Sequence, residues 1–314
     1  MKINVITLFS GYDSQCLGLD RIKESHPDFD YDLIAWAEID KYAIQAHNLI
    51  YPQYADRNLG DVSKIDWKQQ IGRQVIDLLT LSFPCQDISA AGKQRGFEDG
   101  SGTRSSLLWE CERAIDTLRP KVLLMENVKA LVSKKFMPYF QKWCEVLEGY
   151  GYRNYWQVMN ARDYGVPQNR ERVFMISKLD DTPFVFPEPF PLELRLKDVL
   201  EDHVDEKYYL SDKALEYFNR VNDDDSHGHK FTPKDEDDTA FTVRTRPGSR
   251  VDTTSTKIMK QIKVGYVWRS KMNGGVFSPN GISPCLVVGN HSGVAPKIIE
   301  YEDIGVPRPR KGIR

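Results

Sequence analysis

The sequence predicts an α/β fold, with a domain built on a parallel-type sheet followed by a smaller mixed region. Two observations support this prediction. Up to residue 178, short apolar runs of strand length alternate with helical patterns, which is typical of successive βαβ units. Prolines at positions 183, 187, 189 and 191 then interrupt the pattern, and the later chain is polar and rich in turns. We therefore expect domain boundaries near residues 182 and 300.

Size and composition are those of a soluble globular protein. The 314 residues suffice for one large domain or two ordinary ones, with 40% hydrophobic and 28% charged residues. No apolar run reaches the length of a membrane span, and the start leads directly into a strand pattern without a signal peptide. We predict a cytoplasmic protein that does not associate with membranes.

The five cysteines have no paired spacing, which argues against a disulfide framework and for a reducing compartment. No Cys-x-x-Cys or histidine cluster has the spacing of a zinc site, so we expect no metal. Cys16, Cys111 and Cys144 lie in partly apolar helical patterns and are expected to be packing residues.

The net charge of −2 gives no overall argument for nucleic-acid binding. Acidic residues gather at 223–225 and 235–238, and basic residues gather at Arg244, Arg246 and Arg250 and again at 308–314. Such runs are equally consistent with a solvated surface.

The first predicted strand, residues 3–9, ends in a small-residue turn around Gly11 before a helix. Glycine allows the backbone to approach a ligand closely, and a helix start offers free amide donors, as at nucleotide-type cofactor sites. The full GxGxxG pattern is missing, so a dinucleotide is not indicated. Taken alone, the turn is more often a plain strand–helix connection than a cofactor site.

Two acidic residues follow at comparable places. The second strand, residues 33–37, ends in Glu38, whose carboxylate suits the two hydroxyls of a ribose. After a helical pattern over residues 41–49, Asp61 lies in a loop, where a single Asp is commonly a turn or helix cap. The three features in chain order favour a cofactor site.

A cysteine lies at the carboxyl end of the next predicted strand, residues 75–80. Pro84 and Cys85 break this strand, and a polar, glycine-containing stretch runs on to Gly102. In open α/β sheets, ligands bind at this end of the strands. The remaining elements of the first domain are a helix from residues 102–110 to about 118, a strand at 122–125, a helix around 140–149, and strands at 155–159 and 173–176.

Cys85, Glu126 and the pair Arg170 and Arg172 are expected to converge on one sheet edge. An ionised thiol is a strong nucleophile, a carboxyl group can hydrogen-bond or protonate a ring nitrogen, and arginine can hold developing negative charge. No histidine accompanies these motifs as a base, which excludes a cysteine protease. The residues by themselves indicate a cofactor-using enzyme with a nucleophilic cysteine.

Seven segments together resemble the ordered motifs of the DNA (cytosine-5)-methyltransferases. They are residues 9–11 (Phe-Ser-Gly), Glu38, Asp61, 83–86 (Phe-Pro-Cys-Gln), 103–107 (Thr-Arg-Ser-Ser-Leu), 126–128 (Glu-Asn-Val) and 168–172 (Gln-Asn-Arg-Glu-Arg). The resemblance spans residues 3–176. It implies a Rossmann-like, S-adenosylmethionine-dependent catalytic domain over residues 1–182 and a target-recognition region over 183–300, followed by a tail over 301–314.

The resemblance implies that S-adenosylmethionine lies across the strand ends and leaves as S-adenosylhomocysteine. Glu38 would take the ribose hydroxyls, and Asp61 would meet the adenine amino group. The other implied cofactor contacts are Phe9, Gly11, Ile39, Val62, Pro84 and Leu107.

The resemblance also implies the catalytic roles. Cys85 would add to C6 of a cytosine, so that C5 becomes nucleophilic enough to take the methyl group. Glu126 would engage N3 and the exocyclic amine, and Arg172, with Arg170 beside it, would hold O2. Asn127 is interpreted as support for the Cys85 loop. The base must be flipped out of the duplex to reach Cys85, and the stretch from 89 to 102 suits a lid.

The implied partner is double-stranded DNA, as in restriction–modification. The expected DNA contacts are Gln86, Gln168, Arg244, Arg246 and Arg250, with Arg269 and Lys271 as further candidates for phosphate or base contacts.

The sequence departs from the family pattern near its end. The Gly-Asn-His-Ser-Gly stretch at 289–293 only faintly resembles the family's closing turn, and Pro296 follows where a helix should begin. We expect a truncated, split or degenerate closing segment, which a second chain could supply. A DNA- or partner-binding module without activity is therefore the alternative, and a tRNA methyltransferase is a further one. Intact Cys85 and Glu126 favour the enzyme, and the long second region favours DNA.

Overall fold

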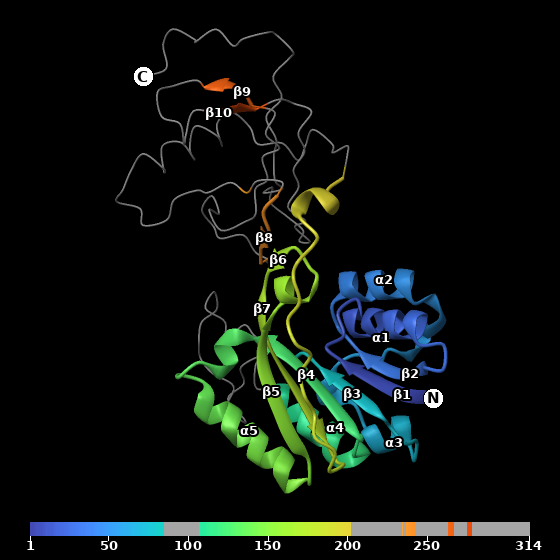
Figure 1. The fold of residues 1–314 in the computed structure, drawn as a ribbon. Coiled ribbons are helices and arrows are strands. Elements are labelled where there is room, and N and C mark those ends of the chain that lie inside the picture. Colours follow the sequence, from blue (N-terminus) through green and yellow to red (C-terminus); the bar gives the residue numbers. More distant parts are fainter. Residues whose placement is uncertain (85–106, 202–233, 235–236, 243–262, 267–274, 278–314) are drawn as a thin grey trace. The chain divides into compact units, whose positions relative to one another are not determined.

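The computed structural model describes residues 1–84, 107–201, 234, 237–242, 263–266 and 275–277 (Figure 1). The chain forms two compact units. One comprises residues 1–159 and 171–187, and the other comprises residues 160–170 and 188–314. The predicted boundary near residue 182 placed residues 160–170 in the first domain, whereas in the structure they belong to the second unit.

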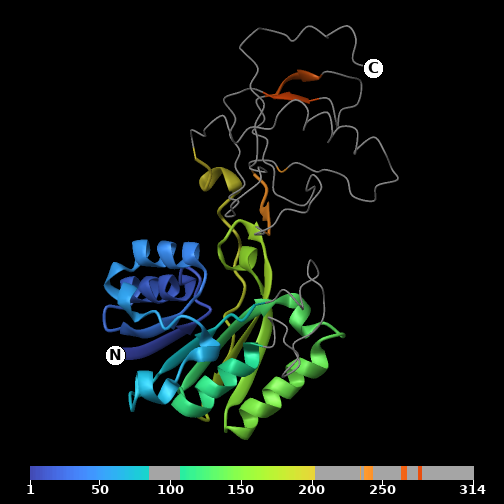
Figure 2. The same ribbon diagram turned by 180° about the vertical axis from the view of Figure 1, so that it is seen from behind.

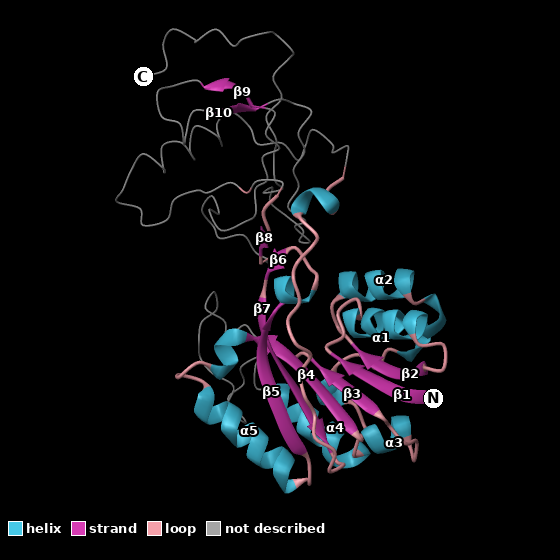
Figure 3. Ribbon diagram, viewed as in Figure 1, coloured by secondary structure: helices cyan, strands magenta, loops and turns pink. Residues whose placement is uncertain are grey.

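The first unit is built on a six-stranded sheet with strand order β2-β1-β3-β4-β7-β5 (Figure 3). Its strands are β1 (Lys2–Leu8), β2 (Asp30–Ala37), β3 (Leu78–Leu81), β4 (Val122–Val128), β5 (Arg153–Asn160) and β7 (Glu171–Lys178). β1 pairs in parallel with β2 and β3, and β3 pairs in parallel with β4. β7 pairs with β4 in the antiparallel direction, so the sheet is mixed rather than wholly parallel.

Helices cover both faces of this sheet (Figures 1 and 2). They are α1 (Ser14–Ser25), α2 (Lys41–Ile50), α3 (Trp67–Ile71), α4 (Leu108–Leu118) and α5 (Met137–Gly149), with short 3₁₀ turns η1 (Pro52–Arg57), η2 (Val62–Lys64) and η4 (Lys129–Val132). Within the described part of the chain, no helix is long and apolar enough to cross a bilayer.

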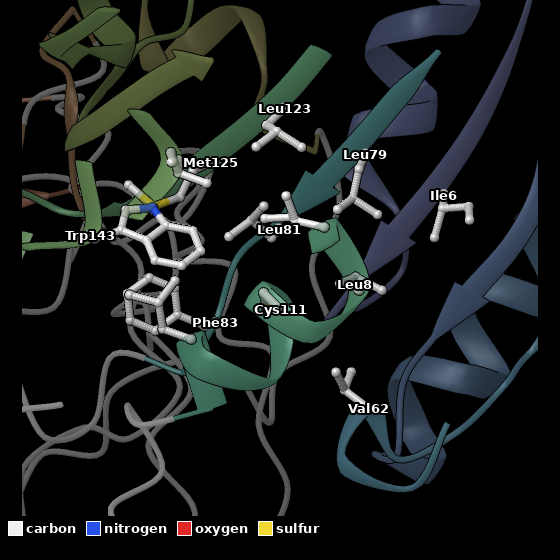
Figure 4. Packing of buried hydrophobic residues seen from close by; sticks show 14 of the residues in the cluster. Ile6, Leu8, Val62, Leu79, Leu81, Phe83, Cys111, Leu123, Met125 and Trp143 are labelled. Atoms are coloured by element: carbon white, nitrogen blue, oxygen red, sulfur yellow. The ribbon is translucent and has the colours of Figure 1, made fainter. Parts of the chain in front are cut away.

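The strands divide their apolar side chains between two cores because successive residues point to opposite faces. Val5 of β1 packs with α1 residues such as Cys16 and with Trp36. Ile6 and Leu8 face the other way, into the cluster with Leu81, Met125 and α4 and α5 residues (Figure 4). Each face of the sheet therefore packs against its own apolar cluster.

Aspartate side chains cap the starts of α2 and α3. Asp40 accepts hydrogen bonds from the amides of Tyr42 and Ala43 at the start of α2, and Asp66 accepts one from Gln69 at the start of α3. Each cap satisfies amides that the first helical turn leaves without a partner. At the other end of α4, Arg119 adopts a left-handed conformation with φ 48°.

In the second unit, η5 (Ala161–Tyr164) leads to β6 (Gln168–Asn169), which pairs in parallel with β8 (Ala240–Phe241). A separate hairpin-like pair joins β9 (Lys263–Tyr266) to β10 (Gly275–Phe277) in the antiparallel direction, and η6 spans Leu196–Asp198. The strands predicted at 239–245 and 263–268 thus overlap β8 and β9, and residues 243–245 and 267–268 lie outside the described residues.

Candidate active site

The carboxyl ends of β1, β2, β3 and β4 lie along one edge of the sheet because these strands run in the same direction. The antiparallel β7 begins at this edge, since Val128 at the end of β4 pairs with Arg172 near the start of β7. Of the residues expected to carry the chemistry, Glu38, Glu126 and Arg172 therefore lie at this edge, although they come from segments far apart in the chain. Cys85 lies outside the described residues.

The turn after β1 has an unusual backbone. Phe9, Gly11 and Asp13 all have positive φ, at 54°, 60° and 68°. A left-handed conformation costs a residue other than glycine about 1–2 kcal/mol, so contacts elsewhere must hold Phe9 and Asp13 in place. An added Cβ at Gly11 would meet no atom of the described structure within 4 Å, so the backbone there faces open space.

Glu38, which directly follows β2, is tied to this turn. Its Oε2 accepts a hydrogen bond from the Gly11 amide at 2.9 Å, and its Oε1 accepts bonds from the amides of Ile39 and Asp40 at 2.7 and 2.8 Å. A carboxylate has about four acceptor positions, so Glu38 retains capacity on Oε2 for a further donor. Ile39 beside it is 71% exposed.

Asn58 supports Glu38 from a neighbouring loop. Its Oδ1 accepts hydrogen bonds from the amides of Glu38 and Gly60, and its Nδ2 donates to the Glu38 carbonyl at 3.1 Å. The sequence predicts no role for this residue. In the sequence, an Asn two residues before Gly60 is an ordinary turn signal. In the structure, the β-bridge between Asn58 and Trp36 places Asn58 against β2.

Asp61 caps η2. Its Oδ1 accepts hydrogen bonds from the amide and the hydroxyl of Ser63, and Lys64 lies 3.5 Å from its Oδ2. The Ser63 hydroxyl, and then its amide, lower the pKa of the Asp61 carboxyl below its ordinary value. Val62 is 3% exposed and belongs to the same apolar cluster as Leu8 and Cys111, all three of which are labelled in Figure 4.

Pro84 and Leu107 flank the segment that is left undescribed. Both are half-buried, Pro84 three residues after β3 and Leu107 immediately before α4. Cys85 and Gln86 lie outside the described residues. The structure therefore defines the two ends of the Cys85 segment.

Glu126 and Arg172 form an ion pair at the strand ends. The Nε of Arg172 lies 3.1 Å from Oε1 of Glu126, and the two side chains are 17% and 28% exposed. The pair joins the end of β4 to the start of β7, which the sequence separates by 46 positions. The same ends are joined again by Lys129 and Glu171, whose charged atoms lie 2.8 Å apart.

Asn127 points to the opposite face from Glu126. Its Nδ2 donates a hydrogen bond to the carbonyl of Phe83 at 3.0 Å, and its Oδ1 accepts one from the Val128 amide. The side chain is 3% exposed. It therefore holds the backbone two residues before Cys85 against β4.

Arg170 and Gln168 belong to the second unit. The Arg170 amide donates to Oδ1 of Asn160 at 3.0 Å, and its carbonyl accepts a bond from the Ala161 amide. Gln168 lies in β6. Arg244, Arg246, Arg250, Arg269, Lys271 and the stretch 289–293 all lie outside the described residues. Among the residues that are described, no three histidine, cysteine or acidic side chains are grouped to hold a metal ion.

Comparisons with known proteins identify the family. The family model for the C-5 cytosine-specific DNA methylase matches residues 3–281. The chain is 50% identical over 161 residues to the type II methyltransferase M2.ScrFI of Lactococcus lactis subsp. cremoris, over 51% of this chain and 44% of that protein. It is 34% identical over 217 residues to the type II methyltransferase M.NlaX of Neisseria lactamica, over 69% of this chain and 65% of that protein.

The chain thus spans less than two thirds of the length of these relatives. Among solved structures, the Dnmt2 methyltransferase of S. pombe superposes with a TM-score of 0.63 at 18% identity, over 84% of this chain and 78% of that chain. This likeness confirms the predicted α/β methyltransferase fold. The family match over residues 3–281, together with the arrangement of the strand ends, shows that the chain belongs to the C-5 cytosine-specific DNA methylases.

Proposed function

We propose that the chain transfers a methyl group from S-adenosylmethionine to C5 of a cytosine in double-stranded DNA. The observation that carries the proposal is the ion pair of Glu126 and Arg172 at the sheet edge. It offers one carboxylate and one guanidinium, side by side, to a planar ring that has both donors and acceptors. Asn127 fastens the chain just before Cys85 to the same strand that bears Glu126.

The residues after β1 and β2 fit S-adenosylmethionine. The open space at Gly11 admits a ligand to the backbone, and the half-buried Phe9 offers an aromatic side chain next to it. Glu38 keeps one acceptor position on Oε2 for a ribose hydroxyl while its other positions hold the turn together. Asp61, 36% exposed at its side chain, would accept a bond from the adenine amino group, with Ile39, Val62, Pro84 and Leu107 as further contacts.

When bound, S-adenosylmethionine supplies a methyl group that is open to nucleophilic attack. The Cys85 thiolate would form a bond to C6, which moves the electron pair of the C5–C6 double bond toward C5. Glu126 would bind N3 and the exocyclic amine, and Arg172, with Arg170 nearby in sequence, would bind O2, where negative charge develops. Once C5 carries the methyl group, loss of the C5 proton restores the double bond and expels the thiolate.

The target base must leave the stack for this attack, because the thiol cannot reach C6 within a duplex. We assign DNA binding to the region 183–300, with Arg244, Arg246 and Arg250 as phosphate or base contacts and with Gln86 and Gln168 near the flipped base. We assign catalysis to residues 1–182.

The test is transfer of labelled methyl from S-adenosylmethionine into unmethylated DNA by the wild type, Cys85→Ser and Cys144→Ser. Cys144 is a matched control because it lies half-buried on α5, away from the strand ends. We expect transfer by the wild type and by Cys144→Ser, and none by Cys85→Ser. Equal transfer by all three proteins would overturn the role of Cys85.

A second assay examines the bond itself. In DNA that contains 5-fluorocytosine, the fluorine cannot leave as the C5 proton does, so the thiol adduct should persist. We expect a complex that survives denaturation with the wild type and with Cys144→Ser, and none with Cys85→Ser. DNA binding by the wild type without transfer or adduct would favour the alternative, a binding module without activity.

A further inference from the structure

A buried polar cluster lies directly beneath the turn formed by residues 9–13 and takes no part in the proposed chemistry. It comprises Asp13, Thr7 and His47, with Trp36 and Cys16 around them. Asp13 and His47 are both fully buried. A charged or polar side chain at such a place must gain from its partners what it loses in hydration.

Asp13 begins α1 in the left-handed conformation. Its Oδ2 accepts a hydrogen bond from the Thr7 hydroxyl at 2.8 Å, and its Oδ1 accepts none from the residues that the structure describes. The Asp13 side chain therefore reaches back from the turn to β1. One hydroxyl and the weakly donating Cys16 thiol compensate little for the burial of a carboxylate.

His47 is the cation-capable group beside this carboxylate. Its Nε2 lies 3.6 Å from Oδ2 of Asp13, and its ring stacks on Trp36 with centroids 3.7 Å apart and planes 20° from parallel. The other ring nitrogen contacts Oδ1 of Asn48 at 3.4 Å. The stacked ring fixes the direction of Nε2, so α2 presents His47 to the base of the turn.

The other titratable groups nearby cannot supply a positive charge. Burial, and then the charge of Asp13, raise the pKa of the Cys16 thiol far above its usual range, so it stays neutral. Tyr31 and Tyr51 both donate their hydroxyls to Asp20. Among the described residues around Asp13, His47 is therefore the basic side chain that lies within ion-pair distance of its carboxylate.

We propose that Asp13 and His47 are positioning residues for the cofactor. Their paired side chains anchor the turn from below and keep Phe9 and Gly11 in the left-handed conformation that presents them to the ligand. The proposal rests on the proposed function in taking S-adenosylmethionine, and its product S-adenosylhomocysteine, as the ligand of this turn. It assigns to the pair no contact with the ligand or the DNA.

A purely conformational need would not select aspartate at position 13. Glycine adopts φ 68° without steric cost, whereas aspartate adopts it at some cost and must also be buried. The glycine variant therefore separates the two explanations. Asp13→Asn separates them again, since asparagine keeps the size and tolerates the left-handed conformation but lacks the charge.

The experiment measures S-adenosylhomocysteine binding by titration calorimetry for the wild type, Asp13→Asn, Asp13→Gly, His47→Gln and the double variant Asp13→Asn with His47→Gln. The matched control is Asp20→Asn, on the same helix, because Asp20 also accepts two side-chain hydrogen bonds in this core. Hydrogen exchange of the peptide covering residues 8–16 gives a second readout without ligand.

We expect each single substitution at Asp13 or His47 to weaken binding about tenfold, and to speed exchange over residues 8–16. The double variant should bind about as weakly as either single one, since both remove the same pair. Asp20→Asn should lower thermal stability without changing affinity.

Asp13→Gly that binds as tightly as the wild type, or a double variant whose losses simply multiply, would overturn the proposal. Failure of the wild type itself to bind S-adenosylhomocysteine or S-adenosylmethionine would instead count against the proposed function. The two failures are therefore distinguishable.

Discussion

The ion pair of Glu126 and Arg172 at the strand ends contributes little to the free energy of unfolding. Both side chains keep some exposure, and a partly solvated pair of this kind contributes only about 0–1 kcal/mol. Its value lies in orientation, because each group holds the other where β4 ends and β7 begins. Substitutions here should therefore affect turnover far more than folding.

Glu126→Gln tests this expectation. We expect methyl transfer under single-turnover conditions to fall by about 10²–10⁴, the scale for loss of a positioned acid or base, with little change in thermal stability. Glu171→Gln is the control, since Glu171 also pairs with a cation across the same two strand ends. Similar transfer rates for the two variants would contradict a specific role for Glu126.

The buried tyrosine Tyr152 is expected to make the stability of the fold depend on pH. Burial raises the pKa of its hydroxyl from 10.0 to about 12, and the hydroxyl donates to the Pro120 carbonyl at 2.6 Å. The folded state holds this proton more tightly than the unfolded state does. The contribution to stability is therefore complete below pH 10 and is lost as the pH rises through 12.

Urea unfolding of the wild type and Tyr152→Phe between about pH 8.5 and 11 would measure this contribution. The range brackets the ordinary tyrosine pKa of about 10. We expect the unfolding free energy of Tyr152→Phe to decline less steeply with alkaline pH. Tyr12→Phe, which removes a half-exposed tyrosine hydroxyl, is the control. Parallel curves for wild type and Tyr152→Phe would show that Tyr152 is not the source.

Among the structural elements, β3 and β4 are joined at their ends by a side chain as well as by backbone pairing. The four paired residues of β3 end at Leu81, opposite Met125, and Asn127 continues the connection through the Phe83 carbonyl. The strand ends would otherwise separate where the Cys85 segment begins. Asn127 thereby fixes the backbone at Phe83 against β4.

Asn127→Ala should cost about 1–3 kcal/mol of unfolding free energy, because it leaves the buried Phe83 carbonyl without this donor. It should also reduce methyl transfer. Asn154→Ala is the matched control, since Asn154 donates to the Cys144 carbonyl at 3.0 Å on another part of the sheet. Chemical denaturation and transfer assays on both variants distinguish the two effects. Equal losses of transfer after correction for stability would contradict a special role for Asn127.

At the scale of the whole molecule, the chain separates into two compact units, and segment 160–170 leaves the first and returns to it at Glu171. The Gln-x-Arg-x-Arg motif therefore divides between them, with Gln168 and Arg170 in one and Arg172 in the other. If the first unit binds the cofactor and the second reads DNA, the two affinities should respond to different substitutions.

The triple variant Arg244→Gln, Arg246→Gln, Arg250→Gln tests that division. We expect its DNA affinity to fall and the slope of log affinity against log salt to become shallower by about 2–3, at about 0.9 per lost phosphate contact. S-adenosylhomocysteine affinity should not change. Arg153→Gln is the control because Arg153 pairs with Asp181 in the first unit. DNA binding that is unaffected by the triple variant would exclude these arginines.

The sequence by itself determined the first unit's strands, most of its helices and the residues at their ends. The local periodicity of apolar residues indicates which segments bury an apolar face. Motifs such as Glu-Asn-Val lie at the ends of those segments. The family and the α/β fold predicted on this basis are confirmed. The assignment of individual site residues stays a prediction, most plainly for Cys85.

Only the tertiary structure decided how these ends meet. The antiparallel course of β7 brings Arg172 to Glu126, although the local pattern of a strand is the same in either direction. Likewise, Asn58 reaches Glu38 across 20 positions, and His47 reaches Asp13 across 34. Such contacts depend on hydrogen bonding and packing between distant segments, which no local pattern of residues encodes.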